Sequence, residues 1–148
     1  MMQKVIEKAD VLIEALPYVQ KFRGDIVVVK FGGSAMEDKA CVRNILNDIA
    51  FMECVGLCPV IVHGGGKAIS QKMKEAGLKP VFVKGLRVTD EQSIDLVEQT
   101  LNREVNPELV RMLEDFGCKA RGIHGEHILS VVKHTEKDAA TGENLDWG

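Results

Sequence analysis

The stretch that decides the fold is residues 25–34, which read DIVVVKFGGS. Residues 26–29 are β-branched apolar side chains in a row, a composition typical of a strand buried on both faces. Lys30 follows directly, and a charged group at the end of a buried strand is costly to desolvate unless it meets an anion or water. Gly32 and Gly33 then remove side chains where something approaches the backbone closely. We therefore expect an anion site at the carboxyl edge of a sheet.

A second strand and glycine turn repeat this arrangement. Residues 59–63 read PVIVH, a short apolar strand, and Gly64, Gly65 and Gly66 follow, with Lys67 beside them. A helical pattern comes next. Glycines can serve only to shape a tight connection between a strand and a helix. Here the glycine turn occurs twice, at equivalent edges of one sheet, with a lysine beside each turn. This repetition instead favours a site that holds a phosphate group between the two turns.

The order of the elements indicates the fold class. Residues 38–55 carry apolar side chains at helical spacing, and a second helix is expected from about residue 66 to residue 76. Strand, helix, strand, helix is typical of parallel sheets with right-handed crossovers. We therefore predict an α/β protein with three layers (αβα) and a mainly parallel central sheet.

The second half of the chain is expected to hold further helices and strands. Thr89 with Gln92 matches a helix N-cap and capping box. Asn106 before Pro107 matches the restart of a helix. We also expect strands at 119–123 and 128–133 around a turn at 124–126, a short strand or extended segment at 80–83, and a loop at 135–144.

Residues 1–22 look separate from residues 23–148, and we treat the two as an N-terminal helical extension and a main domain. Apolar side chains in the first segment recur at helical spacing and form one stripe. Pro17 is expected to break or kink this helix. Packing of the stripe on the chain's own domain and packing on another subunit both remain open. The stripe consists of Val5, Ile6, Ala9, Leu12, Ile13 and Leu16.

Length and charge narrow the classes of function. A chain of 148 residues suits one domain with a sizeable core. The 19 basic and 22 acidic side chains give a net charge of -3 with no basic block, so nucleic acid is not expected as a partner. No apolar run approaches the roughly 20 residues of a membrane span, and the N-terminus lacks the apolar core of a signal peptide. We expect a cytoplasmic protein that does not enter a membrane.

The cysteines and histidines are not expected to bind metal. Cys54 and Cys58 are close in sequence, but no second closely spaced pair of Cys or His residues lies near them. We expect buried or partly buried free thiols at all 4 cysteines. His124 and His127 flank a turn, and no metal site is expected there either.

Several catalytic motifs are absent from the sequence. The glycines before Lys67 lack the spacing of a Walker loop, neither glycine turn has the third glycine of a dinucleotide fingerprint, and no serine-hydrolase elbow is present. What remains are Lys30, the two glycine turns and Arg87. Backbone N–H groups and a lysine stabilise the charge on a transferring phosphoryl group. The planar fork of Arg87 suits a carboxylate, although an ordinary exposed arginine is the alternative.

Three motifs at these positions resemble the amino-acid-kinase family, and within it the N-acetylglutamate kinases. They are VKFGGS at 29–34, VHGGG at 62–66 and GLRVT at 85–89. The first motif also suits aspartate kinases, whereas the other two are similar to the acetylglutamate branch. The resemblance covers the chain from Asp25 onward. The helix at 1–22 resembles the N-terminal extension of the arginine-inhibited, hexameric branch, which links dimers.

The resemblance implies phosphoryl transfer from ATP, with Mg²⁺, to the side-chain carboxylate of N-acetyl-L-glutamate, a step of arginine biosynthesis. Because the carboxylate is already a nucleophile, no general base is needed, and catalysis is positioning plus charge neutralisation. Lys30 is then the catalytic residue that stabilises the phosphoryl group, and Gly32 and Gly33 let that group approach. Backbone N–H groups of Gly64, Gly65 and Gly66 face the substrate, and Arg87 holds its other carboxylate.

The sequence departs from the family in length. Family members are nearly twice as long, and their C-terminal half supplies the nucleotide pocket, a second lysine, an aspartate and an asparagine of the site. We therefore expect residues 23–148 to be the acetylglutamate-binding lobe, truncated before the nucleotide-binding half, inactive alone and assembled as a homo-oligomer, either a dimer or a hexamer. Another carboxylate or carbamate kinase of the same family, and a non-catalytic assembly module, remain as alternatives.

Overall fold

Two parallel strands form the sheet from which both glycine turns leave. The strands are β1 (Ile26–Phe31) and β2 (Cys58–His63). Their register pairs Phe31 with His63, so the two strands end together. The predicted α/β class with a parallel sheet is therefore confirmed. The computed structural model describes residues 2–32, 34–36, 38–132, 134–139 and 141–147.

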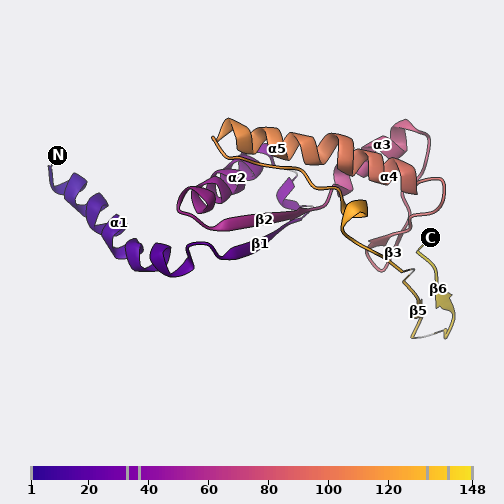
Figure 1. Cartoon of the computed structure of the whole chain (residues 1–148). Helices are drawn as coiled ribbons and strands as arrows, with labels where there is room; N and C mark the ends of the chain where they lie inside the picture. The colour runs from indigo at the N-terminus through magenta and orange to yellow at the C-terminus, as the bar shows by residue number, and fades with distance from the viewer. Residues whose placement is uncertain (1, 33, 37, 133, 140, 148) are drawn as a thin grey trace.

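Helices cover one face of this sheet (Figure 1). Helix α2 (Lys39–Cys54) joins the two strands, and the side chain of Asp38 caps it by accepting a 2.8 Å hydrogen bond from the backbone N–H of Ala40. Helix α5 (Asn106–Asp115) packs beside α2. Side chains from β1 and these helices form the core, which consists of Phe31, Val42, Leu46, Ile49, Val105, Leu109 and Leu113.

The opposite face of the sheet is exposed. Burial alternates along both strands, and Ile26 and Val28 on β1 are 73% and 65% exposed. The expectation that this strand is buried on both faces is wrong for the described part of the chain. A run of β-branched residues favours any strand, and only a covering layer decides how many of its faces are buried. Here α2 and α5 supply that layer on one side.

A continuous helical run replaces the two separate helices expected in the second half. Helix α3 (Gly66–Glu75) follows β2 as predicted. Helix α4 (Ile94–Thr100) continues through the π-helical segment η2 (Leu101–Val105) into α5, and Asn106 has helical backbone angles rather than capping a new helix. Pro107 has no N–H to bond the carbonyl four residues earlier, and the wider π-helical turn before it accommodates this gap without ending the helix.

The start of α4 is set by Asp90 and Ser93 rather than by Thr89 and Gln92. The Ser93 hydroxyl donates to the Asp90 carboxylate at 2.7 Å, and the Ser93 backbone N–H donates to the same carboxylate at 3.0 Å. Ser93 is buried. The predicted capping box is therefore wrong by one residue, because Asp90 and Ser93 form a reciprocal pair that satisfies the same backbone groups.

Helix α1 (Met2–Phe22) extends away from the rest of the chain (Figure 1). It runs through Pro17 as one helix, so of the two expected outcomes the break is wrong and the kink stays a prediction. None of its residues is buried, and an exposed helix lets water bond the carbonyl that Pro17 leaves free. The apolar stripe predicted for this segment stays exposed, with Leu12 and Ile13 at 69% and 68%.

The C-terminal segment departs most from expectation. A 3-10 turn, η3 (Gly125–His127), stands where a hairpin turn was expected, and no strand forms at 119–123 or at 128–132. Lys133 lies outside the described residues. Val131 and Val132 are about nine-tenths exposed, and β-branched residues form a strand only where a neighbouring strand pairs with them. The expected loop at 135–144 instead holds a small antiparallel pair, β5 (Glu136–Lys137) and β6 (Asn144–Leu145).

The remaining expectations concern the thiols and the membrane. All four cysteines are free, as predicted, but Cys54 and Cys58 are exposed rather than buried. None of the helices in the described ranges combines the length and the apolar character that a membrane crossing requires.

Candidate functional site

The two glycine turns meet at one edge of the sheet. Lys30 pairs with Val62 in the register, and the next pair ends both strands. The backbone N–H of Gly64 then donates a 3.3 Å hydrogen bond to the carbonyl of Phe31, across the strand ends. Because parallel strands point the same way, the connections that follow them share this edge. A 3-10 turn, η1 (Ser34–Met36), continues from the first strand, and α3 continues from the second.

The space around the glycines of these turns differs from one position to the next. A side chain at Gly65 would lie 2.8 Å from a methyl carbon of Leu101 and 3.3 Å from one of Val105, so packing against η2 explains this glycine. Side chains at Gly32, Gly64 and Gly66 would meet nothing within 4 Å. None of these three has a left-handed backbone that would favour glycine. Their small size therefore leaves open space at this edge. Gly33 lies outside the described residues.

Lys30 is an exposed cation at the end of the sheet. It lies on the uncovered face of β1, the face that also carries Ile26 and Val28. Within the part of the chain that the structure describes, no carboxylate forms an ion pair with it. Its ammonium group is therefore available to an anion at the edge where the glycine turns meet.

Arg87 lies on a β-hairpin with a two-residue turn. Strands β3 (Phe82–Val83) and β4 (Leu86–Arg87) are antiparallel, and the turn between them is Lys84–Gly85. The two turn residues have φ values of 49° and 80°. Positive φ at both central positions is typical of a type I′ turn, which suits the twist of paired strands. The register pairs Arg87 with Phe82, and the guanidinium stands 4.8 Å from the centre of the phenyl ring.

The hairpin brings the Arg87 side chain to the start of α3. Its Nη2 donates to the carbonyl of Gly66 at 3.1 Å and to the hydroxyl of Ser70 at 2.6 Å, and its Nη1 donates to the sulfur of Met73 at 3.0 Å. Partial burial lowers the pKa of Arg87. Among the described residues no carboxylate pairs with it. The guanidinium is thus a partly desolvated cation that holds only neutral acceptors.

Three contacts with the C-terminal segment hold this hairpin and the residue pair that follows it. Trp147 is buried, and its indole N–H donates to the carbonyl of Val83 at 3.2 Å. The backbone N–H of Thr89 donates to the carbonyl of Trp147 at 2.6 Å. Lys84 forms a 2.9 Å ion pair with Glu136 on β5. The arginine hairpin is therefore fixed from both of its ends.

Sequence reasoning missed the neighbours that position Arg87. Ser70 follows Gly66 by four residues, one helical turn, and its hydroxyl donates to the Gly66 carbonyl at 2.8 Å. That spacing could have placed Ser70 beside the glycine turn. Met73 and Trp147 gave no such signal, because their contacts with the hairpin depend on how distant segments pack.

The chemistry of this edge suits a small anion with two negatively charged ends. Lys30 and Arg87 provide two cations on different elements. The N-terminus of α3 provides backbone N–H groups and the positive end of the helix dipole, beside the open space left by Gly64 and Gly66.

Comparison with known proteins identifies the family of the chain. A sequence model described as "Amino acid kinase family" matches residues 25–146. A protein of Akkermansia muciniphila named acetylglutamate kinase is 48% identical over 145 residues, which are 98% of this chain and 48% of the relative. A protein of the same name from Campylobacter jejuni is 46% identical over 143 residues, which are 95% of this chain and 51% of the relative. The chain therefore spans about half the length of the curated relatives it matches.

A solved structure also shares the fold. The protein smu.665 of Streptococcus mutans is 34% identical and superposes with a TM-score of 0.58, over 66% of this chain and 39% of that protein. The family match covers most of the chain, including both glycine turns and the arginine hairpin. The chain belongs to the amino acid kinase family.

Proposed function

We propose that the chain is the substrate-binding half of an acetylglutamate kinase, which transfers a phosphoryl group from ATP to the side-chain carboxylate of N-acetyl-L-glutamate. This is a step of arginine biosynthesis, and we place it in the cytoplasm. The observation that carries the proposal is the meeting of Arg87 with Gly66 at the edge where β1 and β2 end together. The curated relatives that share this half are named acetylglutamate kinase, which supports the choice of substrate.

The proposed roles follow from the charges at the edge. Arg87 exchanges its neutral acceptors for the α-carboxylate of the substrate, because a charge-assisted pair is the stronger interaction. Backbone N–H groups at Gly65 and Gly66 bind the reacting carboxylate and the phosphoryl oxygens, whereas the N–H of Gly64 already donates to the carbonyl of Phe31. Lys30 neutralises charge on the transferring phosphoryl group. Since the substrate carboxylate is already an anion at neutral pH, no side chain has to remove a proton.

ATP with Mg²⁺ is the proposed phosphoryl donor. The open space at Gly32 fits phosphate oxygens, and so does the Lys30 ammonium, which forms no ion pair within the described residues; Gly33 follows Gly32 in sequence. The metal would neutralise the phosphate charge when bound. We assign most of the nucleotide pocket to the half of the relatives that this chain does not span.

The test is a chimera. The C-terminal half of the Akkermansia muciniphila relative is fused after residue 148, and ADP release is followed with N-acetyl-L-glutamate as acceptor. We expect sustained turnover by the chimera and none by the 148-residue chain. L-aspartate and carbamate serve as competing acceptors. A folded chimera that phosphorylates one of these and not acetylglutamate would replace our proposal with that of another kinase of the family.

A second proposed role is assembly through α1. This helix exposes Val5, Leu12 and Ile13 at 63% or more, and none of its residues is buried. Such an apolar stripe is stabilised when it packs against another subunit. We propose a homo-oligomer, a dimer or a hexamer, that is joined there. Light scattering after size exclusion should show a smaller particle when residues 1–22 are deleted. An unchanged mass would remove assembly as the role of α1.

A further inference from the structure

The 3-10 turn η3 places two histidines side by side. His124 precedes the turn and His127 ends it, and the backbone N–H of His127 donates to the carbonyl of His124 at 3.2 Å. Side chains three residues apart eclipse each other in a 3-10 turn. The two imidazole rings are accordingly stacked, with centroids 5.7 Å apart and planes 10° apart.

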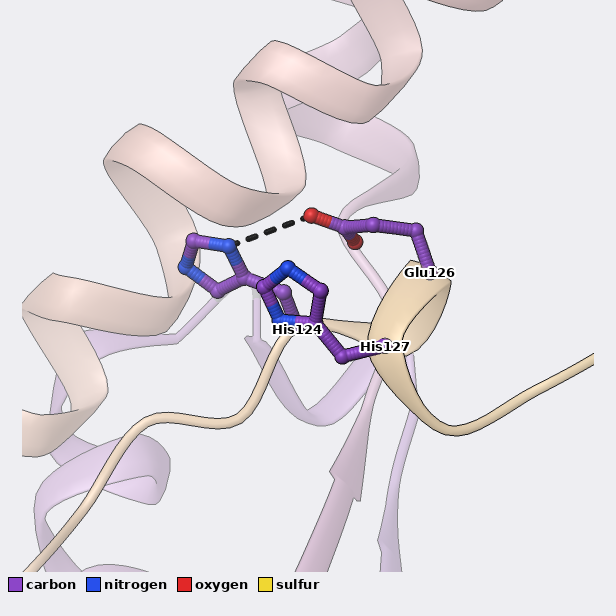
Figure 2. A group of neighbouring side chains, drawn as sticks. All are labelled: His124, Glu126 and His127. Atoms are coloured by element: carbon purple, nitrogen blue, oxygen red, sulfur yellow. Dashed lines mark ion pairs between the residues drawn. The ribbon is translucent and has the colours of Figure 1, made fainter.

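The carboxylate of Glu126 completes the cluster (Figure 2). One of its oxygens lies 3.2 Å from Nδ1 of His124, and the other accepts a 3.0 Å hydrogen bond from the side-chain amide of Asn102. The backbone N–H of Glu126 itself lowers the pKa of this carboxyl most, and Asn102 and the two histidines lower it further. The group is therefore a carboxylate at neutral pH. One ligand atom from each of the three residues lies within 4.8 Å of the others.

We propose that His124, Glu126 and His127 bind one Zn²⁺ ion. Two imidazoles and a carboxylate form a common zinc ligand set that leaves the fourth tetrahedral position to water. Bonds of about 2.0–2.2 Å place tetrahedral ligand atoms about 3.4 Å apart. The three side chains therefore have to close by about 1 Å, which rotation of exposed side chains permits. This site revises the expectation, drawn from sequence spacing, that no metal binds here.

An ordinary ion pair does not account for the arrangement. An exposed histidine–carboxylate pair contributes little to stability and needs only one histidine. Here a second imidazole lies parallel to the first, so two rings and one carboxylate gather at one turn. A divalent cation bound by one nitrogen of each neutral imidazole and by the carboxylate uses all three groups, once the rings turn so that these nitrogens face the ion.

The contacts around the cluster resemble the outer shell of a metal site. Asn102 belongs to η2 and orients the Glu126 carboxylate. The side-chain amide of Asn106 donates to the carbonyl of Ile123 at 3.2 Å, next to the cluster. Leu101, beside Asn102, packs on the Gly65 position. The ion would thus fasten the C-terminal segment to the helical run that supports the second glycine turn.

Calorimetric titration of the full chain with ZnCl₂ tests this site. Cys54 and Cys58 are exposed thiols, and thiolates are zinc ligands, so both are first changed to serine to remove this source of background binding. We expect one ion per chain in that background. His124→Ala, His127→Ala and the isosteric Glu126→Gln should each weaken binding by about tenfold or more, and Asn102→Ala by about tenfold. His134→Ala is the control, because His134 lies outside the cluster, and it should leave the affinity unchanged.

Other outcomes overturn the site. These are no zinc binding by the serine background, unchanged affinity in the double variant His124→Ala with His127→Ala, or an equal loss in His134→Ala. Far-UV circular dichroism of each variant separates loss of the site from loss of the fold. The titration contains no substrate or nucleotide, so its result is independent of the proposed kinase activity.

Discussion

Arg87 and Gly66 are joined by a 3.1 Å hydrogen bond from the guanidinium to the backbone carbonyl, although they are 21 residues apart in sequence. The bond ties the arginine hairpin to the first turn of α3, where the second glycine turn ends. The other acceptors of the guanidinium are the Ser70 hydroxyl and the Met73 sulfur, and a thioether is a weak acceptor. Within the described ranges, the arginine is therefore bonded to neutral acceptors and forms no ion pair with a carboxylate.

Arg87→Ala should weaken N-acetyl-L-glutamate binding by about 100-fold, because a hydrogen bond to a charged group contributes about 1.5–3 kcal/mol. We expect a much smaller effect on folding. Calorimetry and thermal melts of the same samples check both parts. Arg43→Ala is a matched control, since Arg43 also stacks on a phenyl ring, 5.1 Å from Phe116. A large fall in melting temperature with unchanged affinity would assign Arg87 a structural role only.

Alanine at two neighbouring glycines should have opposite effects. Gly65→Ala should lower the free energy of unfolding by about 1–3 kcal/mol, because the new methyl group meets Leu101 and Val105. Gly66→Ala should leave that free energy unchanged or raise it by up to about 1 kcal/mol, since the residue is helical with open space around it. The same methyl group should weaken acetylglutamate binding about tenfold. Urea unfolding and calorimetry measure the two quantities.

Lys30→Ala in the chimera should lower kcat by about 100- to 1000-fold, the usual cost of removing one group that stabilises transition-state charge. Because Lys30 is exposed and forms no ion pair within the described ranges, the melting temperature should hardly change. Lys39→Ala, an exposed lysine at the start of α2, is the control. Equal activity of the two variants would exclude Lys30 from the chemical step.

Ser93→Ala should lower the free energy of unfolding by about 1–2 kcal/mol, because buried Ser93 bonds to Asp90 at the start of α4. The Ser93 hydroxyl is the main cause of the lowered pKa of Asp90. A lowered pKa stabilises the fold above the ordinary carboxyl pKa of about 3.9, and this contribution is lost as the pH falls through the folded-state value. Thermal melts between pH 7 and pH 2 should show a shallower acid decline in the variant.

The order of the elements was predictable as far as α3, whereas the C-terminal segment and the surroundings of the elements were not. The β-branched run at residues 26–29, the glycine turns and the helix at 38–55 are local signals, and all lie where the sequence indicated. The valines at 131 and 132 carry an equally strong strand signal, yet they pair with no neighbour. A β-branched segment forms a strand only where a neighbouring strand pairs with it, and the tertiary structure decides whether such a neighbour is present.

The same distinction between local sequence signals and packing of distant segments applies to the candidate site. Lys30, the glycines and Arg87 could be named from motifs, because each sits at the end of a recognisable local element. The contact between Arg87 and Ser70, and the support of the hairpin by Trp147, depend on segments that are distant in sequence. The grouping of His124, Glu126 and His127 depended on a 3-10 turn where a hairpin was expected.

A crystal structure of the chain soaked with N-acetyl-L-glutamate tests the central claim most directly. The account predicts one ligand at the shared edge of β1 and β2, with one carboxylate on the guanidinium of Arg87. Its other carboxylate should face the backbone N–H groups of Gly65 and Gly66, with the Lys30 ammonium on the same side. A ligand bound elsewhere, or Lys30 and the glycine amides on opposite sides of the ligand-bound molecule, would contradict it.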